Sequence, residues 1–141
     1  MSSIPSALLA ASAAIVLLLG LAHLLYTFVG PKLLPRDREL QVRMQEVSPV
    51  ITRQTTMWKA WIGFNASHSL GAMLFSLVYL MLAARHMDVL RQSPTFVWLA
   101  GIASAAYVVL ALRYWFRIPL AATAIATSCF VAGALTMSLG Y

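Results

Sequence analysis

The sequence predicts an all-α integral membrane protein built as an antiparallel bundle of four membrane-spanning helices. Of its 141 residues 61% are hydrophobic and only 10% are charged, which excludes an ordinary soluble domain. Four apolar runs are each long enough to cross a bilayer, which takes about 20 helical residues. We expect spans at residues 6–30, 55–84, 95–113 and 119–140, all within a single transmembrane domain covering residues 1–141.

The first span is expected to be retained rather than removed as a signal peptide. A signal peptide begins with basic residues, and this span contains no Lys or Arg. Gly30 and Pro31 should end the helix, because proline cannot continue the hydrogen-bond ladder. Near that end His23, Tyr26 and Thr27 share one helical face, which is unusual in a span made mostly of Ala, Leu and Val.

The link at residues 32–54 is the most polar part of the chain. A helix start at Asp37, followed by apolar Leu40, Met44 and Val47, predicts a short amphipathic helix lying on the membrane surface. The arginines of this link are typical of a segment that orients the chain in the membrane. They are also compatible with recognition of anionic lipid or phosphate.

The sequence also predicts where span four begins and what lies between spans two and three. Pro119 is expected to be the first helical residue of span four, a position that proline favours. The short polar link between spans two and three, residues 85–94, is expected to be a loop in which His86 is solvated.

The basic residues also predict the orientation. The first and third links, together with the span ends that border them, hold Lys32, Arg36, Arg38, Arg43, Arg53, Lys59, Arg113 and Arg117. The second link holds only Arg85 and Arg91. By the positive-inside rule the first and third links face the cytoplasm, which puts both termini outside. We expect a multi-pass protein of the bacterial cytoplasmic (inner) membrane.

The net charge of +6 does not indicate nucleic-acid binding, because the basic residues lie at the ends of apolar runs and form no stripe with stacking aromatic residues. A single cysteine, Cys129, excludes an intramolecular disulfide and a cysteine-based zinc site. The expected partners are the lipid bilayer, a hydrophobic small molecule, and either another protein or a second copy of the chain.

Polar side chains gather at one depth of the expected bundle. At the helical rise of about 1.5 Å per residue, His23 lies about 10 Å and His68 about 13 Å from the cytoplasmic ends of their spans. All four spans contribute polar residues to this half, which predicts a pocket there. We expect Asn65 to bond to the His68 imidazole and fix its tautomer. The candidate ligand-binding residues are His23, Tyr26, Thr27, Trp61, Asn65, His68, Ser69, Tyr107, Thr123 and Thr127.

Four functions fit this pocket, and its cofactor is undetermined. The preferred one is an accessory protein that binds the polar head of an amphiphile such as a lipid, quinone or isoprenoid. The second is a haem b protein with His23 and His68 as axial ligands; without haem, two histidines make a poor dedicated metal site. The third is an isomerase or proton-transfer enzyme in which His68 is the acid or base, although no span holds Asp or Glu. The fourth is a scaffold whose polar cluster only fixes helix register.

Two segments of the first half carry a resemblance to a known family. The runs from Tyr26 to Asp37 (YTFVGPKLLPRD) and from Thr52 to Ser69 (TRQTTMWKAWIGFNASHS) resemble a family of small bacterial four-span membrane proteins. This resemblance implies the architecture and no activity. In size and four-span plan the chain is also similar to the eukaryotic scaffold family of ergosterol biosynthesis, which implies an accessory or tethering role.

Overall fold

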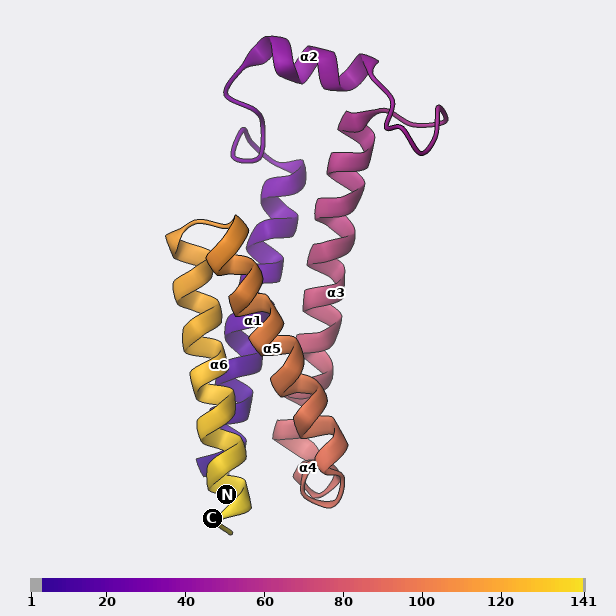
Figure 1. Ribbon diagram of the computed structural model, residues 1–141. Helices are drawn as coiled ribbons and strands as arrows, with labels where there is room; N and C mark the ends of the chain where they lie inside the picture. The colour runs from indigo at the N-terminus through magenta and orange to yellow at the C-terminus, as the bar shows by residue number, and fades with distance from the viewer. Residues whose placement is uncertain (1–3, 141) are drawn as a thin grey trace. The chain divides into compact units, whose positions relative to one another are not determined.

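A computed structural model describes residues 4–140, and this part of the chain is helical without strands (Figure 1). The long helices are α1 (Ile4–Phe28), α3 (Met57–Arg85), α5 (Pro94–Tyr114) and α6 (Arg117–Ser138), and the short ones are α2 (Arg38–Glu46) and α4 (Met87–Gln92). Each of the four long helices is apolar and long enough to cross a membrane. The chain is therefore a multi-pass membrane protein.

The chain divides into two compact units, and both α1 and α3 contribute residues to each. Among the described residues, the major unit comprises 4–19 and 72–140, and the minor unit comprises 20–71. The major unit thus contains the first part of α1, the second part of α3, and all of α4, α5 and α6. The minor unit contains the end of α1, α2 with its two flanking loops, and the beginning of α3.

The major unit packs small and apolar side chains between helices. Its core is formed by Leu9, Ala13, Tyr79, Leu82, Ala83, Leu90, Ala100 and Phe130. Gly133 of α6 lies so close to α1 that an added Cβ would stand 2.9 Å from Cγ of Leu9. The Ser6 hydroxyl donates to the carbonyl of Ala83 at 2.6 Å, and the Tyr79 hydroxyl donates to that of Phe96 at 2.7 Å. Close approach at small residues with a few interhelical hydrogen bonds is how membrane helices associate.

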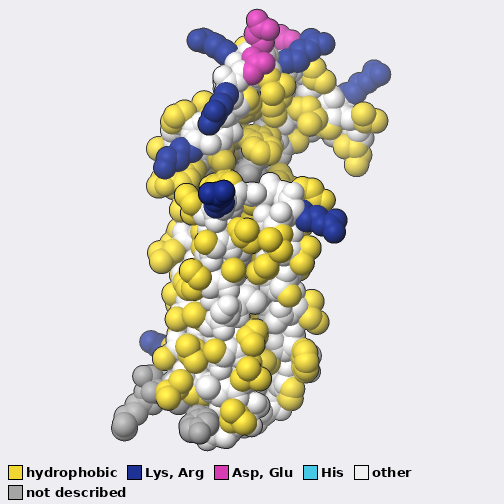
Figure 2. All heavy atoms as spheres, turned by 60° about the vertical axis from the view of Figure 1, so that its left-hand side comes forward, with side chains coloured by type: hydrophobic (Ala, Val, Ile, Leu, Met, Phe, Trp, Pro, Cys, Tyr) yellow, Lys and Arg dark blue, Asp and Glu magenta, His cyan; other side chains and the backbone are white. Residues whose placement is uncertain are grey.

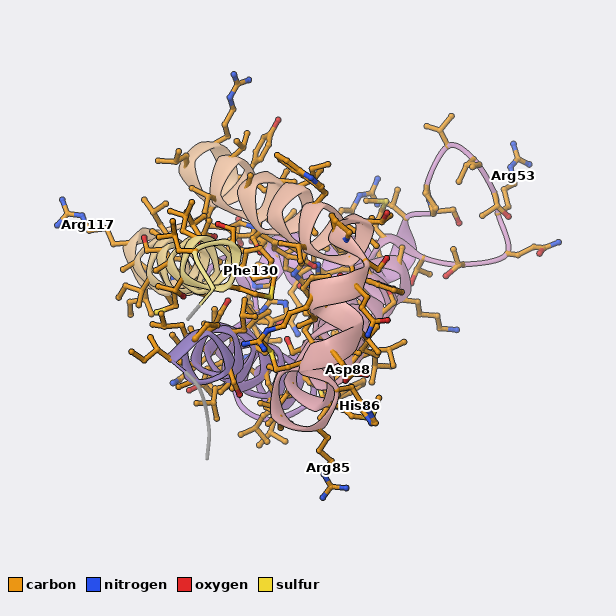
Figure 3. All side chains as sticks on the ribbon, turned by 90° about the horizontal axis from the view of Figure 1, so that it is seen from below. Arg53, Arg85, His86, Asp88, Arg117 and Phe130 are labelled. Carbon is orange, nitrogen blue, oxygen red and sulfur yellow. The ribbon has the colours of Figure 1, made fainter. Side chains whose placement is uncertain are left out.

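The four long helices begin and end within two residues of the predicted spans, and two predicted details between them are wrong. Helix α6 begins at Arg117, so Pro119 is its third residue and not its first. Proline is tolerated there because the first N–H groups of a helix have no intrahelical partner. The link expected to be a loop contains α4, and His86 is exposed at the position that precedes this helix. Arg85 and Arg117 project outward from their helices (Figure 3).

In the minor unit α2 lies crosswise to the beginning of α3 (Figure 1). Gly30 has a φ of +81°, a conformation suited to glycine, and it turns the chain away from α1. Asp37 caps α2, because its Oδ1 accepts from the backbone N–H of Glu39 at 2.9 Å. Beyond α2 the loop 47–56 is closed by the N–H of Met57, which donates to the Val47 carbonyl at 2.8 Å.

Candidate functional site

A hydrogen bond between two helices lies at the centre of the minor unit. Nε2 of His23, on α1, is 2.9 Å from Oδ1 of Asn65, on α3. The Nδ2 group of Asn65 donates to the Trp61 carbonyl at 2.7 Å, one turn earlier on the same helix. Since a carbonyl only accepts, this bond fixes the orientation of the amide and leaves Oδ1 facing His23. Nε2 of His23 must therefore carry the proton and donate it to Asn65.

Three hydroxyls near this bond are satisfied within their own helices. Thr27 donates to the His23 carbonyl at 2.8 Å, Ser69 donates to the Asn65 carbonyl at 2.8 Å, and Ser67 donates to the Phe64 carbonyl at 3.0 Å. Such bonds to a preceding turn satisfy a hydroxyl in an apolar environment without a partner helix. These hydroxyl protons are consequently engaged in the helices.

The second imidazole, His68, lies against the first. The ring centroids of His23 and His68 are 5.6 Å apart, and the ring planes meet at 82°, an edge-to-face arrangement. On its own helix His68 is stacked with Phe64 at a centroid distance of 6.2 Å and an interplanar angle of 11°. The predicted bond between Asn65 and His68 is wrong, because the Asn65 amide bonds to His23 and to the Trp61 carbonyl instead. The two residues are on one helix, and the Asn65 amide oxygen points across to α1, where it meets His23.

The cluster of His23, Asn65 and His68 reaches the surface of its unit. Asn65 is buried, whereas both imidazoles are half-buried. Phe64, which stacks on His68, is 68% exposed. All three cluster residues lie inside the apolar helices α1 and α3 rather than at their polar ends. Both imidazoles are thus partly exposed on membrane-spanning helices, where a polar side chain is costly and often marks a functional site.

Tyr26 and Trp61, two of the predicted site residues, interact with the first loop. Nζ of Lys32 lies 4.0 Å from the centroid of the Tyr26 ring, a cation–π contact at the end of α1. The indole Nε1 of Trp61 donates to the Leu33 carbonyl at 3.3 Å. Both contacts position the loop that leaves α1.

The other three predicted site residues belong to the major unit. Thr123 donates to the Pro119 carbonyl at 2.9 Å, and Thr127 reaches the Ser104 carbonyl at 3.5 Å. Tyr107 packs against Trp115, with ring centroids 6.2 Å apart. A void of about 20 Å³ within this unit has room for a single water and not for a ligand.

The two histidines do not fit axial ligation of haem. Such ligation requires the porphyrin to lie between the imidazoles, with one ring nitrogen of each directed at the iron. Here the two rings touch edge to face, and Nε2 of His23 is directed at Asn65. Within residues 4–140 no group of three or more His, Cys, Asp or Glu side chains gathers to hold a metal ion.

Three residues that contact this site, Phe64, Lys32 and Leu33, were not predicted from the sequence. Phe64 precedes His68 by four residues, and side chains at this spacing are neighbours on a helix, so the stacking of the two rings could have been predicted. Lys32 and Leu33 lie in an irregular loop, where no periodic pattern indicates what a side chain will contact.

Comparison with known proteins gives no relative: no family model, no curated protein and no solved structure matches this chain. Its function must therefore be inferred from the residues and their geometry.

Proposed function

We propose that this protein is a small membrane-embedded binding or accessory protein whose cluster of His23, Asn65 and His68 holds the polar end of an amphiphile. One observation carries the proposal: the two imidazoles are in contact and only half-buried on apolar, span-length helices. A polar cluster with a purely structural role is expected to be buried between the helices, away from the surrounding lipid. An accessible one favours a ligand whose polar end meets the exposed part of the cluster.

The bonding of His23 restricts the chemistry of that ligand. With its proton on Nε2, the neutral ring presents Nδ1 as a hydrogen-bond acceptor. Within residues 4–140 no donor reaches Nδ1. The ligand should therefore offer a hydroxyl, as an isoprenoid alcohol, a quinol or a hydroxylated lipid does. The exposed rings of Phe64 and Trp61 are suited to contact its apolar part.

The proposal places the cluster in the inner half of an antiparallel four-helix bundle in a bacterial cytoplasmic membrane. The bond between Ser6 and Ala83, within the major unit, supports antiparallel α1 and α3, because it joins the beginning of one helix to the end of the other. In the minor unit, His23 near the end of α1 meets Asn65 near the beginning of α3, which supports the same direction. The basic links then face the cytoplasm, and both termini lie outside.

The orientation can be tested with single cysteines. In a Cys129→Ser background, Gln54→Cys probes the first link and Gln92→Cys probes the second; both positions are exposed. In intact cells a membrane-impermeant maleimide should label Gln92→Cys and leave Gln54→Cys unlabelled. The reverse pattern would contradict the orientation and put the histidine cluster in the outer half.

Binding can be tested by identifying what copurifies with the protein. The protein is purified in a mild detergent, and its amphiphiles are extracted and quantified by mass spectrometry. We expect a hydroxyl-bearing amphiphile that falls about fivefold in His23→Phe, the equivalent of one hydrogen bond of about 1 kcal/mol in a membrane. His68→Ala should also lower its retention.

The third histidine supplies a matched control. His86 is exposed beside α4 and belongs to the major unit, so His86→Ala should retain the amphiphile at the wild-type level. Equal composition of extracts from wild type, His23→Phe and His68→Ala would contradict the proposal and favour a purely structural cluster. A thermal-stability shift on adding the identified compound, present in the wild type and absent in His23→Phe, separates loss of binding from loss of folding.

A further inference from the structure

The link between α1 and α3 contains an open groove that the proposed function does not use. It has a volume of about 390 Å³ and is lined by α2 and by the chain that immediately precedes it. Its lining consists of Pro35, Arg36, Arg38, Gln41, Val42 and Gln45. Two guanidinium groups and two carboxamides thus surround a concave surface with an apolar wall.

The charge around this groove favours an anion. Residues 32–59 contain six basic and three acidic side chains. Arg43 is paired with Glu46 at 3.3 Å, whereas within residues 4–140 neither Arg36 nor Arg38 forms an ion pair. Asp37 lies between them in sequence, but its carboxylate caps α2 by accepting from the Glu39 N–H. Guanidinium groups bind phosphate oxygens in a bidentate manner, and the carboxamides of the two glutamines add donors.

Exposed apolar residues in the same unit indicate that the anion is part of a lipid. Val50 is fully exposed and Ile51 is 91% exposed in the loop 47–56. Leu40 and Val42 on α2 are also exposed. Figure 2 shows hydrophobic side chains interspersed with Lys and Arg side chains, and with a few acidic ones, at this end of the molecule. A surface that is both basic and apolar is typical of a segment seated on a membrane, where the apolar side chains enter the leaflet.

Both ends of this link continue into span-length apolar helices, so it is held at the membrane surface. Arg53, two residues after the exposed Ile51, projects outward from the loop (Figure 3). A basic residue close to an exposed apolar pair is suited to a negatively charged leaflet.

We propose that the groove of Arg36, Arg38, Gln41 and Gln45 binds the phosphate of an anionic lipid headgroup, while Val50 and Ile51 insert into the same leaflet. The groove selects the headgroup, and the apolar pair selects a lipid over a soluble phosphate. This site is separate from the histidine cluster and does not depend on its ligand.

Headgroup binding can be measured by native mass spectrometry of the full chain titrated with phosphatidylglycerol and, in parallel, with phosphatidylcholine. We expect preferential binding of phosphatidylglycerol. The double variant Arg36→Gln/Arg38→Gln should weaken it by at least tenfold, since one arginine near an anionic surface contributes about fivefold. The control Arg113→Gln/Arg117→Gln removes the same charge at two other exposed arginines and should retain most of the binding.

Three outcomes would overturn the headgroup site. Equal weakening by the two double variants would mean that only net charge matters. Unchanged binding in Arg36→Gln/Arg38→Gln would exclude the groove. Displacement of the lipid by millimolar inorganic phosphate would make soluble phosphate the ligand instead.

Insertion of the loop can be measured independently with an environment-sensitive dye. In the Cys129→Ser background the dye is attached at Ile51→Cys, or at exposed Gln54→Cys of the same loop as a control, in nanodiscs containing a spin-labelled lipid quencher. We expect stronger quenching at position 51 than at position 54, and more in phosphatidylglycerol discs than in phosphatidylcholine discs. Equal, weak quenching at both positions in both lipids would contradict insertion.

Discussion

Nε2 of His23 donates to Oδ1 of Asn65 at 2.9 Å, and this bond joins α1 to α3 within the minor unit. The direction of the bond follows from the Asn65 amide, whose nitrogen is occupied by the Trp61 carbonyl. One consequence is structural, because a polar contact inside apolar helices specifies how they align. The other is chemical, because it leaves the second nitrogen of His23 as an acceptor.

A double-mutant cycle on this pair should show direct coupling. We expect His23→Ala and Asn65→Ala each to destabilise the protein, with an interaction free energy of about 0.6–1.7 kcal/mol, the range for hydrogen bonds in membranes. Reversible unfolding in mixed micelles measures it. The control cycle of His86→Ala with Asn65→Ala should give no coupling, since His86 is exposed in the other unit. Additive effects in the first cycle would contradict the bond.

Haem supplementation should leave the protein colourless. Because the His23 and His68 rings touch and Nε2 of His23 is engaged by Asn65, we expect no Soret band after expression with added haem and purification in mild detergent. A low-spin spectrum that disappears in both His23→Ala and His68→Ala would contradict this expectation and reinstate the haem interpretation.

Gly133→Ala should destabilise the packing of α6 against α1. The added Cβ would stand 2.9 Å from Leu9 Cγ and 3.2 Å from Leu8 Cβ, so the helices must separate. We expect a loss of about 1–3 kcal/mol, the usual cost of overpacking, measured by thermal unfolding in detergent. Gly71→Ala is the matched control: nothing lies within 4 Å of its added Cβ, so it should be neutral or mildly stabilising. Equal effects of the two substitutions would contradict the close approach.

Tyr79→Phe should destabilise the contact between α3 and α5. The change removes the bond from the Tyr79 hydroxyl to the Phe96 carbonyl at 2.7 Å and leaves the ring in the core. The expected loss is about 1 kcal/mol in the same unfolding assay. Tyr114→Phe removes an exposed hydroxyl and should have little effect. A Tyr79→Phe protein as stable as the wild type would mean that this bond contributes nothing.

The sequence predicted the helical spans well, because their length and apolar content are properties of single segments. It also placed His23 and His68 at similar depths, since the helical rise converts sequence position into height, and the structure places the two rings in contact. The start of α2 could also be predicted, because Asp37 caps the helix through a local hydrogen bond to the backbone.

What the sequence could not predict depends on side-chain direction and on irregular backbone. Asn65 lies near His68 on its own helix, and only the packing of α1 shows that its amide meets His23 instead. Helix α4 and the early start of α6 lie in segments too short for a periodic pattern to develop. The contact of Lys32 with Tyr26 depends on a loop conformation set by Gly30.

The most direct measurement of ligand binding at the histidine cluster is photocrosslinking from α3. Benzoylphenylalanine replaces Phe64, which stacks on His68 and is 68% exposed, or Leu74, which is on the same helix and is 66% exposed. After irradiation in native membranes, position 64 should carry one discrete hydroxyl-bearing adduct that disappears in His23→Phe, whereas position 74 should carry bulk phospholipid. The same phospholipid mixture at both positions, unchanged in His23→Phe, would contradict the proposal that the cluster binds an amphiphile.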